Sequence, residues 1–425
     1  MSKAFKATPL FDAHRSFVRL PMGAHMLDGY PDSKAFLEHV CDSIPAAIED
    51  FSHTQAFLKS YSRKSEATYR SYRNEVERLL LWTWTIEGKS VIALKRQNLE
   101  SYFDFVHNPP AAWVANSVGD RFRQIGGESR QNKEWRPFVA KIAKQDRKNA
   151  VEAGKAIPSA KDGHTLSHEA MKICYSALSC FYDYLTEEGY AFGNPIPAIR
   201  KQSPFLIKGV TSKSIKRLSD LQWDYVLDCA ALAADKDPAY ERMLFTVAML
   251  KTLYLRVSEL SDRANWQPVW KHFWQDTDGN NWLKVLGKGN KIRDVSVPNS
   301  LGAYIKRYES HRQSLSASFG VNATLVGKNR GAGGMTSRQL RRIVQQAFDL
   351  AHEKMRVEGF SDEATALREA TTHWLRHTGA SQDIATRPLK HMADDLGHAS
   401  MGTTDRVYIQ SDMKERARTG KERDV

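Results

Sequence analysis

Four separated segments of this 425-residue sequence carry side chains that could act on a phosphate group. Together they supply two guanidinium groups, one ammonium group, two imidazoles and a phenol, from Arg256, Lys288, His373, Arg376, His398 and Tyr408. Phosphoryl transfer requires cationic hydrogen-bond donors around the non-bridging oxygens, with a nucleophile and a leaving group in line. Arginines bind such oxygens through two bonds each, and a phenol can be the nucleophile. The residue types therefore indicate phosphoryl transfer.

Spacing brings some of these groups together. His373 and Arg376 are three residues apart, so on a helix both side chains project from one face and could contact the same phosphate. Lys288 lies between Gly287 and Gly289, and in such a turn its amine could protonate a departing 5′ oxygen. We expect Arg256 to end one helix and His373 to begin another.

Each residue also has an ordinary interpretation. Arg256 and Glu259 could form a surface ion pair, and Gly-Lys-Gly is a common tight-turn sequence. His377 points about 100° away from Arg376 around a helix, so we expect it to be structural. Tyr408 alone would be an ordinary helix residue. The inference of phosphoryl transfer therefore rests on the order of these residues along the chain and not on any one of them.

That order resembles the signature of the tyrosine recombinase (phage integrase) family: Arg, Lys, His-x-x-Arg, His and Tyr. The matching positions are Arg256, Lys288, His373, Arg376, His398 and Tyr408. The resemblance covers about Leu218 to Gln410, and its specific stretches are Arg256–Leu260, Gly287–Lys291, His373–Thr378 and Leu396–Thr404. Residues 62–106 and 166–199 are similar, less specifically, to the helical core-binding domain of that family.

The resemblance implies a transesterification that needs no metal ion, cofactor or ATP. Tyr408 would attack the scissile phosphate and form a 3′-phosphotyrosyl bond, releasing a 5′ hydroxyl. Arg256 and Arg376 would stabilise the transition state, and Lys288 would be the general acid. His373 and His398 would donate hydrogen bonds or carry the nucleophile's proton, while Glu259 would brace the site. The implied partners are double-stranded DNA recombination sites, a homo-oligomer assembled on DNA as a tetramer of two dimers, and an optional accessory protein.

Two positions depart from the family pattern. Tyr254 stands two residues before Arg256, where the family commonly has glycine, so we expect different local helix packing. Tyr408 lies ten residues after His398, where nine is commoner. One extra residue rotates a helical side chain by about 100°. We expect a local loop or bulge to absorb the change, since no other tyrosine follows His398.

Hydrophobic periodicity predicts a mainly α fold with a small β-hairpin in the catalytic domain. The basic linker and the family resemblance imply that two domains form a clamp around DNA. Residues 1–35 are expected to be an N-terminal extension and 218–425 the catalytic domain. Between them, 36–199 would be the helical core-binding domain with a basic insertion near 111–163, and 200–217 an extended basic linker. Apolar spacing predicts helices over 62–84, 99–106, 167–185, 221–232 and 240–255, a hairpin over 282–297, and a helix capped by Thr336.

The formal net charge of +13 favours an anionic partner such as DNA. Expected phosphate contacts come from the linker and the hairpin, at Lys201, Lys208, Lys213, Lys216, Arg217 and Lys291. A plain solvated linker is the alternative, and the basic insertion could equally be a DNA-facing element or a solvated helical surface. The four cysteines form no CxxC pair and no apolar run is long enough for a membrane span, so we expect a cytoplasmic protein without a membrane partner. The family resemblance further implies a bacterial or phage-encoded protein associated with the nucleoid.

Two further classes of function remain open. A type IB topoisomerase uses a similar set of Arg, Lys, His and Tyr to relax supercoils without pairing two sites. A catalytically silent DNA-binding regulator could keep the same fold. The complete His398 segment and the helical N-terminal half favour recombination over DNA relaxation, and the complete set of candidate catalytic groups argues against a silent regulator.

Overall fold

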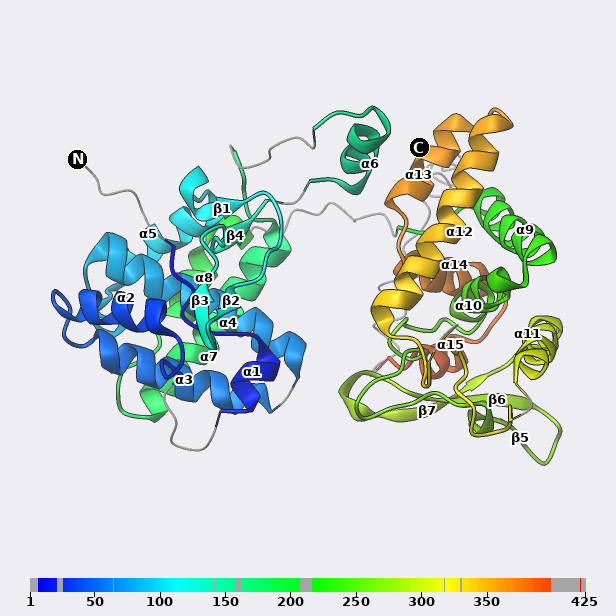
Figure 1. Cartoon of the computed structure of the whole chain (residues 1–425), viewed down its shortest axis with the longest axis horizontal. Coiled ribbons are helices and arrows are strands. Elements are labelled where there is room, and N and C mark those ends of the chain that lie inside the picture. Colours follow the sequence, from blue (N-terminus) through cyan, green and yellow to red (C-terminus); the bar gives the residue numbers. More distant parts are fainter. Residues whose placement is uncertain are drawn as a thin grey trace. The chain divides into compact units, whose positions relative to one another are not determined.

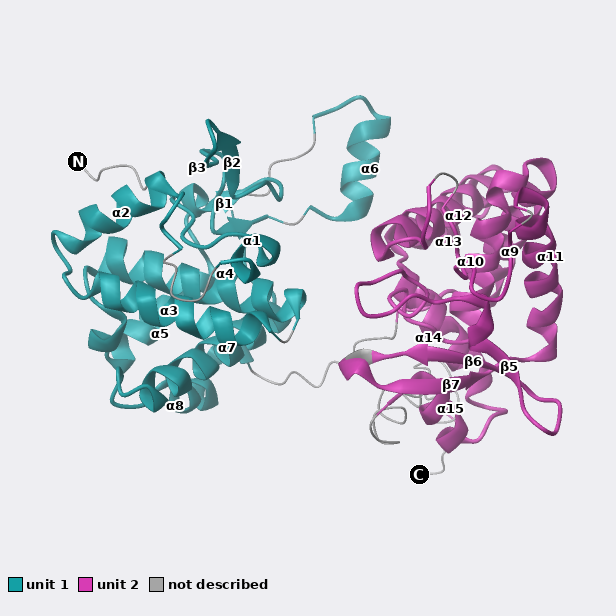
Figure 2. Ribbon diagram, turned by 60° about the horizontal axis from the view of Figure 1, so that its bottom comes forward, with its two compact units in different colours: residues 1–210 teal, residues 211–425 magenta. Residues whose placement is uncertain are grey.

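The computed structural model describes residues 7–20, 26–63, 65–140, 142–156, 163–206, 216–316, 318–328, 331–398 and 421. The chain divides into two compact units, residues 1–210 and 211–425 (Figures 1 and 2). Each unit has a hydrophobic core of its own. Helices predominate in both, and the strands form small sheets of two or three strands.

The first unit is a bundle of helices joined by short turns and one longer non-helical insertion. Its α-helices are α1 (His14–Val18), α2 (Pro31–Cys41), α3 (Ala47–Ser62), α4 (Glu66–Trp82), α5 (Arg96–His107), α6 (Lys144–Glu152), α7 (His168–Glu187) and α8 (Ile196–Gln202). The shorter helical turns are η1 (Thr83–Glu87), η2 (Val91–Ala93), η3 (Ala111–Trp113) and η4 (Pro204–Leu206). Helix α4 packs against α3 and α7, so these three form the centre of the unit.

Local sequence explains the ends of the central helices. The hydroxyl of Ser65 accepts a hydrogen bond from the backbone N–H of Thr68, and Ser167 caps α7 in the same way. One π-helical turn, η1, extends α4, and Gly88 then ends it in the left-handed conformation at φ 63°. The helices expected over 62–84, 99–106 and 167–185 are confirmed, with boundaries shifted by a few residues.

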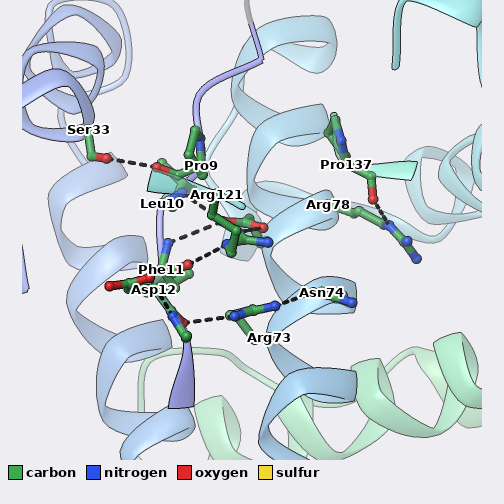
Figure 3. Close-up of polar contacts among 12 residues, drawn as sticks. Pro9, Leu10, Phe11, Asp12, Ser33, Arg73, Asn74, Arg78, Arg121 and Pro137 are labelled. Atoms are coloured by element: carbon green, nitrogen blue, oxygen red, sulfur yellow. Dashed lines mark hydrogen bonds and ion pairs between the residues drawn. The ribbon is translucent and has the colours of Figure 1, made fainter. Parts of the chain in front are cut away.

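Residues 7–20 are part of the core of the first unit rather than a separate N-terminal extension. Phe11 and Phe17 are fully buried. The backbone N–H of Leu10 donates to the buried Glu77 carboxylate on α4 at 2.6 Å, and the hydroxyl of Ser33 donates to the Pro9 carbonyl at 2.7 Å. Figure 3 shows this segment lying along the helices, with Arg73 reaching the Asp12 carbonyl. Burial of two aromatic rings and these backbone bonds explains why the segment is folded into the unit.

The basic insertion near 111–163 is neither a continuous helical surface nor a row of solvated cations over its described part. It contains β1 (Val114–Ala115), β2 (Phe122–Ile125), β3 (Glu128–Gln131) and β4 (Phe138–Val139), in two two-stranded sheets. The side chain of Arg121 is 10% exposed, pairs with Glu77, donates to the Phe11 carbonyl and stacks over Trp135. Some of its cations therefore hold the insertion on the unit (Figure 3), whereas the short helix α6 projects from it (Figure 1).

The segment expected to be an extended linker begins with helical structure. Residues 200–202 complete α8, and residues 204–206 form η4, which packs on α7. The hydroxyl of Ser203 accepts from Tyr175 at 2.9 Å and from the backbone N–H of Phe205 at 3.2 Å. The extended interpretation is therefore wrong for residues 200–206, and residues 207–215 lie outside the described part of the chain.

The second unit combines a helical core with a three-stranded antiparallel sheet at one end (Figure 1). Its helices are α9 (Asp220–Lys236), α10 (Glu241–Thr252), α11 (Gly302–Leu315), α12 (Ser337–Val357), α13 (Ser361–Glu369), α14 (Thr372–Asp383) and α15 (Leu389–Leu396). The strands are β5 (Phe273–Gln275), β6 (Asn281–Leu286) and β7 (Ile292–Ser296), and the shorter turns are η5 (Pro238–Tyr240), η6 (Trp270–His272), η7 (Lys288–Asn290) and η8 (Asn299–Leu301). Helix α10 packs against α9, α11, α12 and α14, so it is the central helix.

The predicted hairpin and the cap of α12 are confirmed. Strands β6 and β7 pair in antiparallel register, with Val285 opposite Arg293 and Leu283 opposite Val295. The buried side chains of Leu283, Val285 and Val295 share one face of the sheet, as the period of two requires. Thr336 and Gln339 form a capping box at the start of α12. None of the helices within the described residues is long and apolar enough to cross a membrane.

Candidate functional site

Arg256 follows α10, which ends at Thr252, rather than lying in the last turn of the helix. Glu259 holds it from two sides: the carboxylate accepts the Arg256 backbone N–H at 2.8 Å and Nη1 of the same arginine at 3.2 Å. The side chain of Glu259 is only 1% exposed, whereas that of Arg256 is 27% exposed. The pair is therefore not a surface ion pair, because a buried carboxylate directs an arginine that still reaches solvent.

Helix α14 carries two of the site residues, His373 and Arg376, in its first two turns, together with His377. Thr371 precedes the helix in an extended conformation, so His373 lies near its start as expected. Arg376 is 1% exposed, and its guanidinium donates to the Tyr254 carbonyl at 2.6 Å and to the Leu396 carbonyl at 2.7 Å. These two bonds fix the orientation of the guanidinium before any phosphate arrives. The rings of His373 and His377 pack edge to face, with 4.6 Å between the ring centroids.

His398 follows α15, which Gly397 ends in the left-handed conformation at φ 64°. Nε2 of His398 lies 3.3 Å from Nη2 of Arg376. Because arginine has only donors, Nε2 is the acceptor and the ring proton is on Nδ1. The structure thus brings Arg256, Glu259, Arg376 and His398 together from three segments, with His373 beside them.

The other predicted site residues lie at the sheet end or beyond the described part. Lys288 is in the turn η7 between β6 and β7, as expected, and this turn is closed by a bond of 2.8 Å from the Gly287 N–H to the Lys291 carbonyl. Lys291 itself is exposed. Tyr408 and the extra residue before it lie outside the described residues.

The arginines and partial burial together keep the histidines of the site neutral. Burial is the largest cause that lowers the pKa of His398 to about 4, and the charges of Arg376 and Arg256 add to it. The same causes lower the pKa of His373, and burial and neighbouring charges lower that of His377 to about 4. Burial alone would raise the pKa of Glu259, but bonds from Arg293 and Arg256 lower it. A site with neutral imidazoles, a buried carboxylate and arginines is suited to bind an anion.

These pKa values predict an acid-labile contribution to stability. The pKa of His398 is lower in the folded chain than the usual 6.5, so between about pH 6.5 and 4 the unfolded state binds a proton that the folded state does not. The free energy of unfolding should therefore fall as the pH drops through that window. His398→Gln should make this fall shallower, measured by urea unfolding at pH 7 and pH 4.5. The control is His391→Gln, an exposed residue on the preceding helix α15, and equal slopes for both variants would contradict the expectation.

Tyr254 explains the first departure from the family pattern. Its φ of 50° lies in the left-handed region, where a tyrosine costs about 1 kcal/mol and a glycine almost nothing. The side chain is buried, and its phenol donates to Asp383 and accepts from Nη1 of Arg387 at 3.1 Å. The expected difference in helix packing takes the form of a left-handed turn after α10, stabilised by these bonds to the phenol.

The proposed phosphate-binding lysines and arginines are spread over both units. Lys201 is exposed at the end of α8 in the first unit. Lys216 and Arg217 are exposed in the second unit, where Lys216 pairs with Glu369 at 3.3 Å and lies 5.9 Å from the centre of the Trp374 ring. Lys208 and Lys213 lie outside the described residues. Lys216 therefore already has an acidic partner, while Lys201 and Arg217 reach solvent.

Sequence reasoning missed two residues that hold the site together. Arg293 on β7 pairs with Glu259 at 2.8 Å, and the carboxylate of Asp395 on α15 accepts from Arg387 at 2.7 Å and from the Ser296 hydroxyl at 2.6 Å. A signal for Arg293 was present, because it shares the core-facing side of its strand with Val295. An arginine at such a position requires a buried acidic partner. No group of three or more metal-ligating side chains occurs within the described residues.

Comparison with known proteins identifies relatives of this chain. The family model described as "Phage integrase family" matches residues 229–415. A tyrosine recombinase XerC from Halalkalibacterium halodurans is 30% identical over 241 residues, which cover 55% of this chain and 68% of the relative. A tyrosine recombinase XerC from Thermodesulfovibrio yellowstonii is 29% identical over 250 residues, covering 56% of this chain and 70% of the relative.

Solved structures show the same fold. The XerH site-specific recombinase bound to palindromic difH substrate, in a post-cleavage complex, superposes with a TM-score of 0.55 at 15% identity, covering 98% of this chain and 99% of that one. Its pre-cleavage complex with difH gives a TM-score of 0.50 at 14% identity, covering 97% and 98%. The sequence relatives, together with this shared fold, show that the chain is an enzyme of the class that cuts and rejoins DNA. The chain belongs to the tyrosine recombinase, or phage integrase, family.

Proposed function

We propose that this enzyme cleaves and rejoins DNA at specific sites through a 3′-phosphotyrosyl bond to Tyr408, without a metal ion or ATP. The observation that carries the proposal is the convergence of Arg256, Arg376 and His398 from three separate segments: Arg256 is bound by the buried Glu259, His398 lies 3.3 Å from Arg376, and burial and the charges of both arginines lower the pKa of His398. Arg376 is fixed by two backbone carbonyls, and Arg256 by Glu259. Two oriented guanidiniums match the charge that develops on the non-bridging oxygens of a phosphodiester under attack.

In the proposed step, the phenolic oxygen of Tyr408 forms a bond to phosphorus and the bond from phosphorus to the 5′ oxygen breaks. His373 accepts the phenol proton, which the neutral state implied by its lowered pKa allows, while His398, whose Nε2 already accepts from Arg376, donates a hydrogen bond from Nδ1. Lys288 protonates the departing 5′ oxygen. One phosphoester replaces another, so the reverse reaction can rejoin the strand without an energy source.

The proposed partner is double-stranded DNA that carries a recombination site. The net charge of +13 supports binding to phosphates, with Lys201, Lys208, Lys213, Lys216, Arg217 and Lys291 as the proposed contacts. The XerH structures, which hold difH substrate, support a duplex as the ligand of this fold. We further propose that the enzyme works as a tetramer of two dimers on DNA, with room for an accessory protein, in the bacterial cytoplasm at the nucleoid.

A covalent-capture experiment tests the function and separates it from the two alternatives. Fragments of the source genome are incubated with the protein, the mixture is denatured, and fragments that remain attached to protein are sequenced. A recombinase retains fragments that share one sequence, with the modified peptide containing Tyr408. A type IB topoisomerase retains fragments without a shared sequence and relaxes plasmids. A silent regulator retains none, and that result would overturn the proposal.

The role of Lys288 gives a prediction with a chemical rescue. Lys288→Ala should slow adduct formation about 100-fold on normal DNA, because the departing 5′ oxygen then lacks its proton donor. On a substrate with sulfur at the bridging 5′ position, the variant should approach the parent rate, since a thiolate leaves without a proton. The rates come from denaturing gels of the captured fragment. Lys284→Ala, an exposed residue on β6, is the control and should cleave both substrates like the parent. A Lys288 defect of equal size on both substrates would limit the role of this lysine to phosphate binding.

A further inference from the structure

Arg293 lies on strand β7 with its guanidinium directed into the second unit. Its side chain is 13% exposed. Nη1 and Nη2 donate to the two carboxylate oxygens of Glu259 at 2.8 and 3.1 Å, and Nε donates to the Asp395 carbonyl at 2.9 Å. All three guanidinium nitrogens are thus bonded to atoms of segments other than the strand that carries the arginine.

Two glycines face this guanidinium at close range. A Cβ atom on Gly287 would lie 2.9 Å from Nη1 of Arg293, which is too close for any ordinary contact. A Cβ atom on Gly397 would lie 3.1 Å from the Cδ, Nε and Cζ atoms of the same side chain. Gly397 also has a φ of 64°, which favours glycine independently. Both glycines therefore allow the backbone to approach Arg293.

The segments that meet at Arg293 are those that carry the site residues. Glu259 orients Arg256, Gly287 immediately precedes Lys288, and Gly397 immediately precedes His398. Glu259 and Asp395 are separated from Arg293 by 34 and 102 positions in the sequence. One side chain thus touches the Arg256 segment, the hairpin turn and the His398 segment.

We propose that Arg293 is a positioning residue for DNA strand cleavage, which sets the spacing of the Arg256 segment, the turn that bears Lys288, and His398. The proposal rests on the function proposed above. A planar guanidinium with bonds on three nitrogens fixes distances in a way that a single charge cannot. Displacement of a reacting group by about 1 Å lowers a rate by about 100-fold. Neutralising Glu259 is the simpler role, and it requires only a positive charge at this position.

Three variants separate positioning from simple charge neutralisation. Arg293→Met should slow adduct formation about 100-fold per folded molecule. Arg293→Lys restores the charge beside Glu259 but cannot make both the bidentate contact and the bond to Asp395, so it should recover less than about a tenth of the lost rate. The matched control is Arg307→Met, which removes another bidentate arginine–glutamate pair from the same unit, with Nη2 and Nε bonded to the two carboxylate oxygens of Glu241 at 2.7 and 3.0 Å. That control should keep the parent rate.

Backbone hydrogen exchange in the DNA-free protein supplies a readout that does not depend on cleavage. Two bonded amides report on the segments: the Gly287 N–H, bonded to the Lys291 carbonyl at 2.8 Å, and the His398 N–H, bonded to the Ala393 carbonyl at 3.0 Å. Both should exchange faster in Arg293→Met than in the parent or in Arg307→Met. Any of three results would overturn the proposal. These are unchanged exchange at both amides, a parent-like cleavage rate in Arg293→Met, or a parent-like cleavage rate in Arg293→Lys. If the parent itself forms no adduct, the proposed function fails, and the exchange measurement still decides whether Arg293 positions these segments.

Discussion

Tyr408→Phe is expected to abolish the covalent protein–DNA adduct while leaving duplex affinity unchanged. The substitution removes one oxygen, which is the proposed nucleophile, and almost no surface. Arg256 is oriented by Glu259, and Arg376 by the Tyr254 and Leu396 carbonyls, so we expect both guanidiniums to keep these hydrogen bonds in the variant. The variant should therefore bind DNA with the parent's affinity but form no covalent adduct.

The measurement uses a DNA fragment recovered in the covalent-capture experiment. Affinity comes from a gel-shift titration at fixed salt concentration, and adduct formation from the same mixture after denaturation. Tyr304→Phe on α11 in the same unit is the matched control and should retain both activities. An adduct that persists in Tyr408→Phe would show that another residue is the nucleophile. Loss of binding together with the adduct would point to misfolding instead of lost chemistry.

The sequence predicts elements whose signals are local. The helix with His373 and Arg376, the hairpin around Lys288, and the cap at Thr336 each depend on residues within about one or two turns of each other. These predictions are confirmed with small shifts in boundaries, because helix caps and a period of two leave a strong pattern. The sequence indicated the left-handed turn at Tyr254 only because the family commonly has glycine at this position. A tyrosine rarely adopts a positive φ, so its presence does not predict one.

Contacts between distant segments could not be predicted in the same way. The bond from Arg293 to the Asp395 carbonyl spans 102 positions, and the one from the Leu10 N–H to Glu77 spans 67. Charge alone assigns such residues to the surface, because a solvated face is the common state of a charged side chain. In the basic insertion, for example, Arg121 pairs with Glu77 inside the first unit, whereas Arg123, Lys133 and Arg147 are exposed. Buried partners, which the sequence does not reveal, decide whether a cation is structural.

Helix α14 approaches α10 more closely than any side chain at position 379 would allow. A Cβ atom on Gly379 would lie 2.1 Å from the Lys251 carbonyl oxygen and 3.0 Å from Cδ1 of Tyr254. The oxygen belongs to the backbone near the end of α10, so it cannot move without shifting the helix. Gly379 therefore sets the distance between the central helix of the unit and the helix that carries His373 and Arg376.

Gly379→Ala is accordingly expected to destabilise the protein by about 3 kcal/mol or more, a change of about two orders of magnitude in the folding equilibrium. In the fraction that remains folded, α14 must move away from α10, and the Arg376 guanidinium moves with it relative to the Tyr254 carbonyl. A displacement of about 1 Å should slow adduct formation by a further factor of about 100. Urea unfolding measures the loss of stability, and covalent capture measures the slower adduct formation.

Gly302→Ala at the start of α11 is the matched control, because a Cβ atom there meets nothing within 4 Å. This variant should change the free energy of unfolding by less than about 0.5 kcal/mol. Equal stability of the two variants would mean that α10 and α14 can separate at little cost, and that Arg376 is not held by the close approach of these helices.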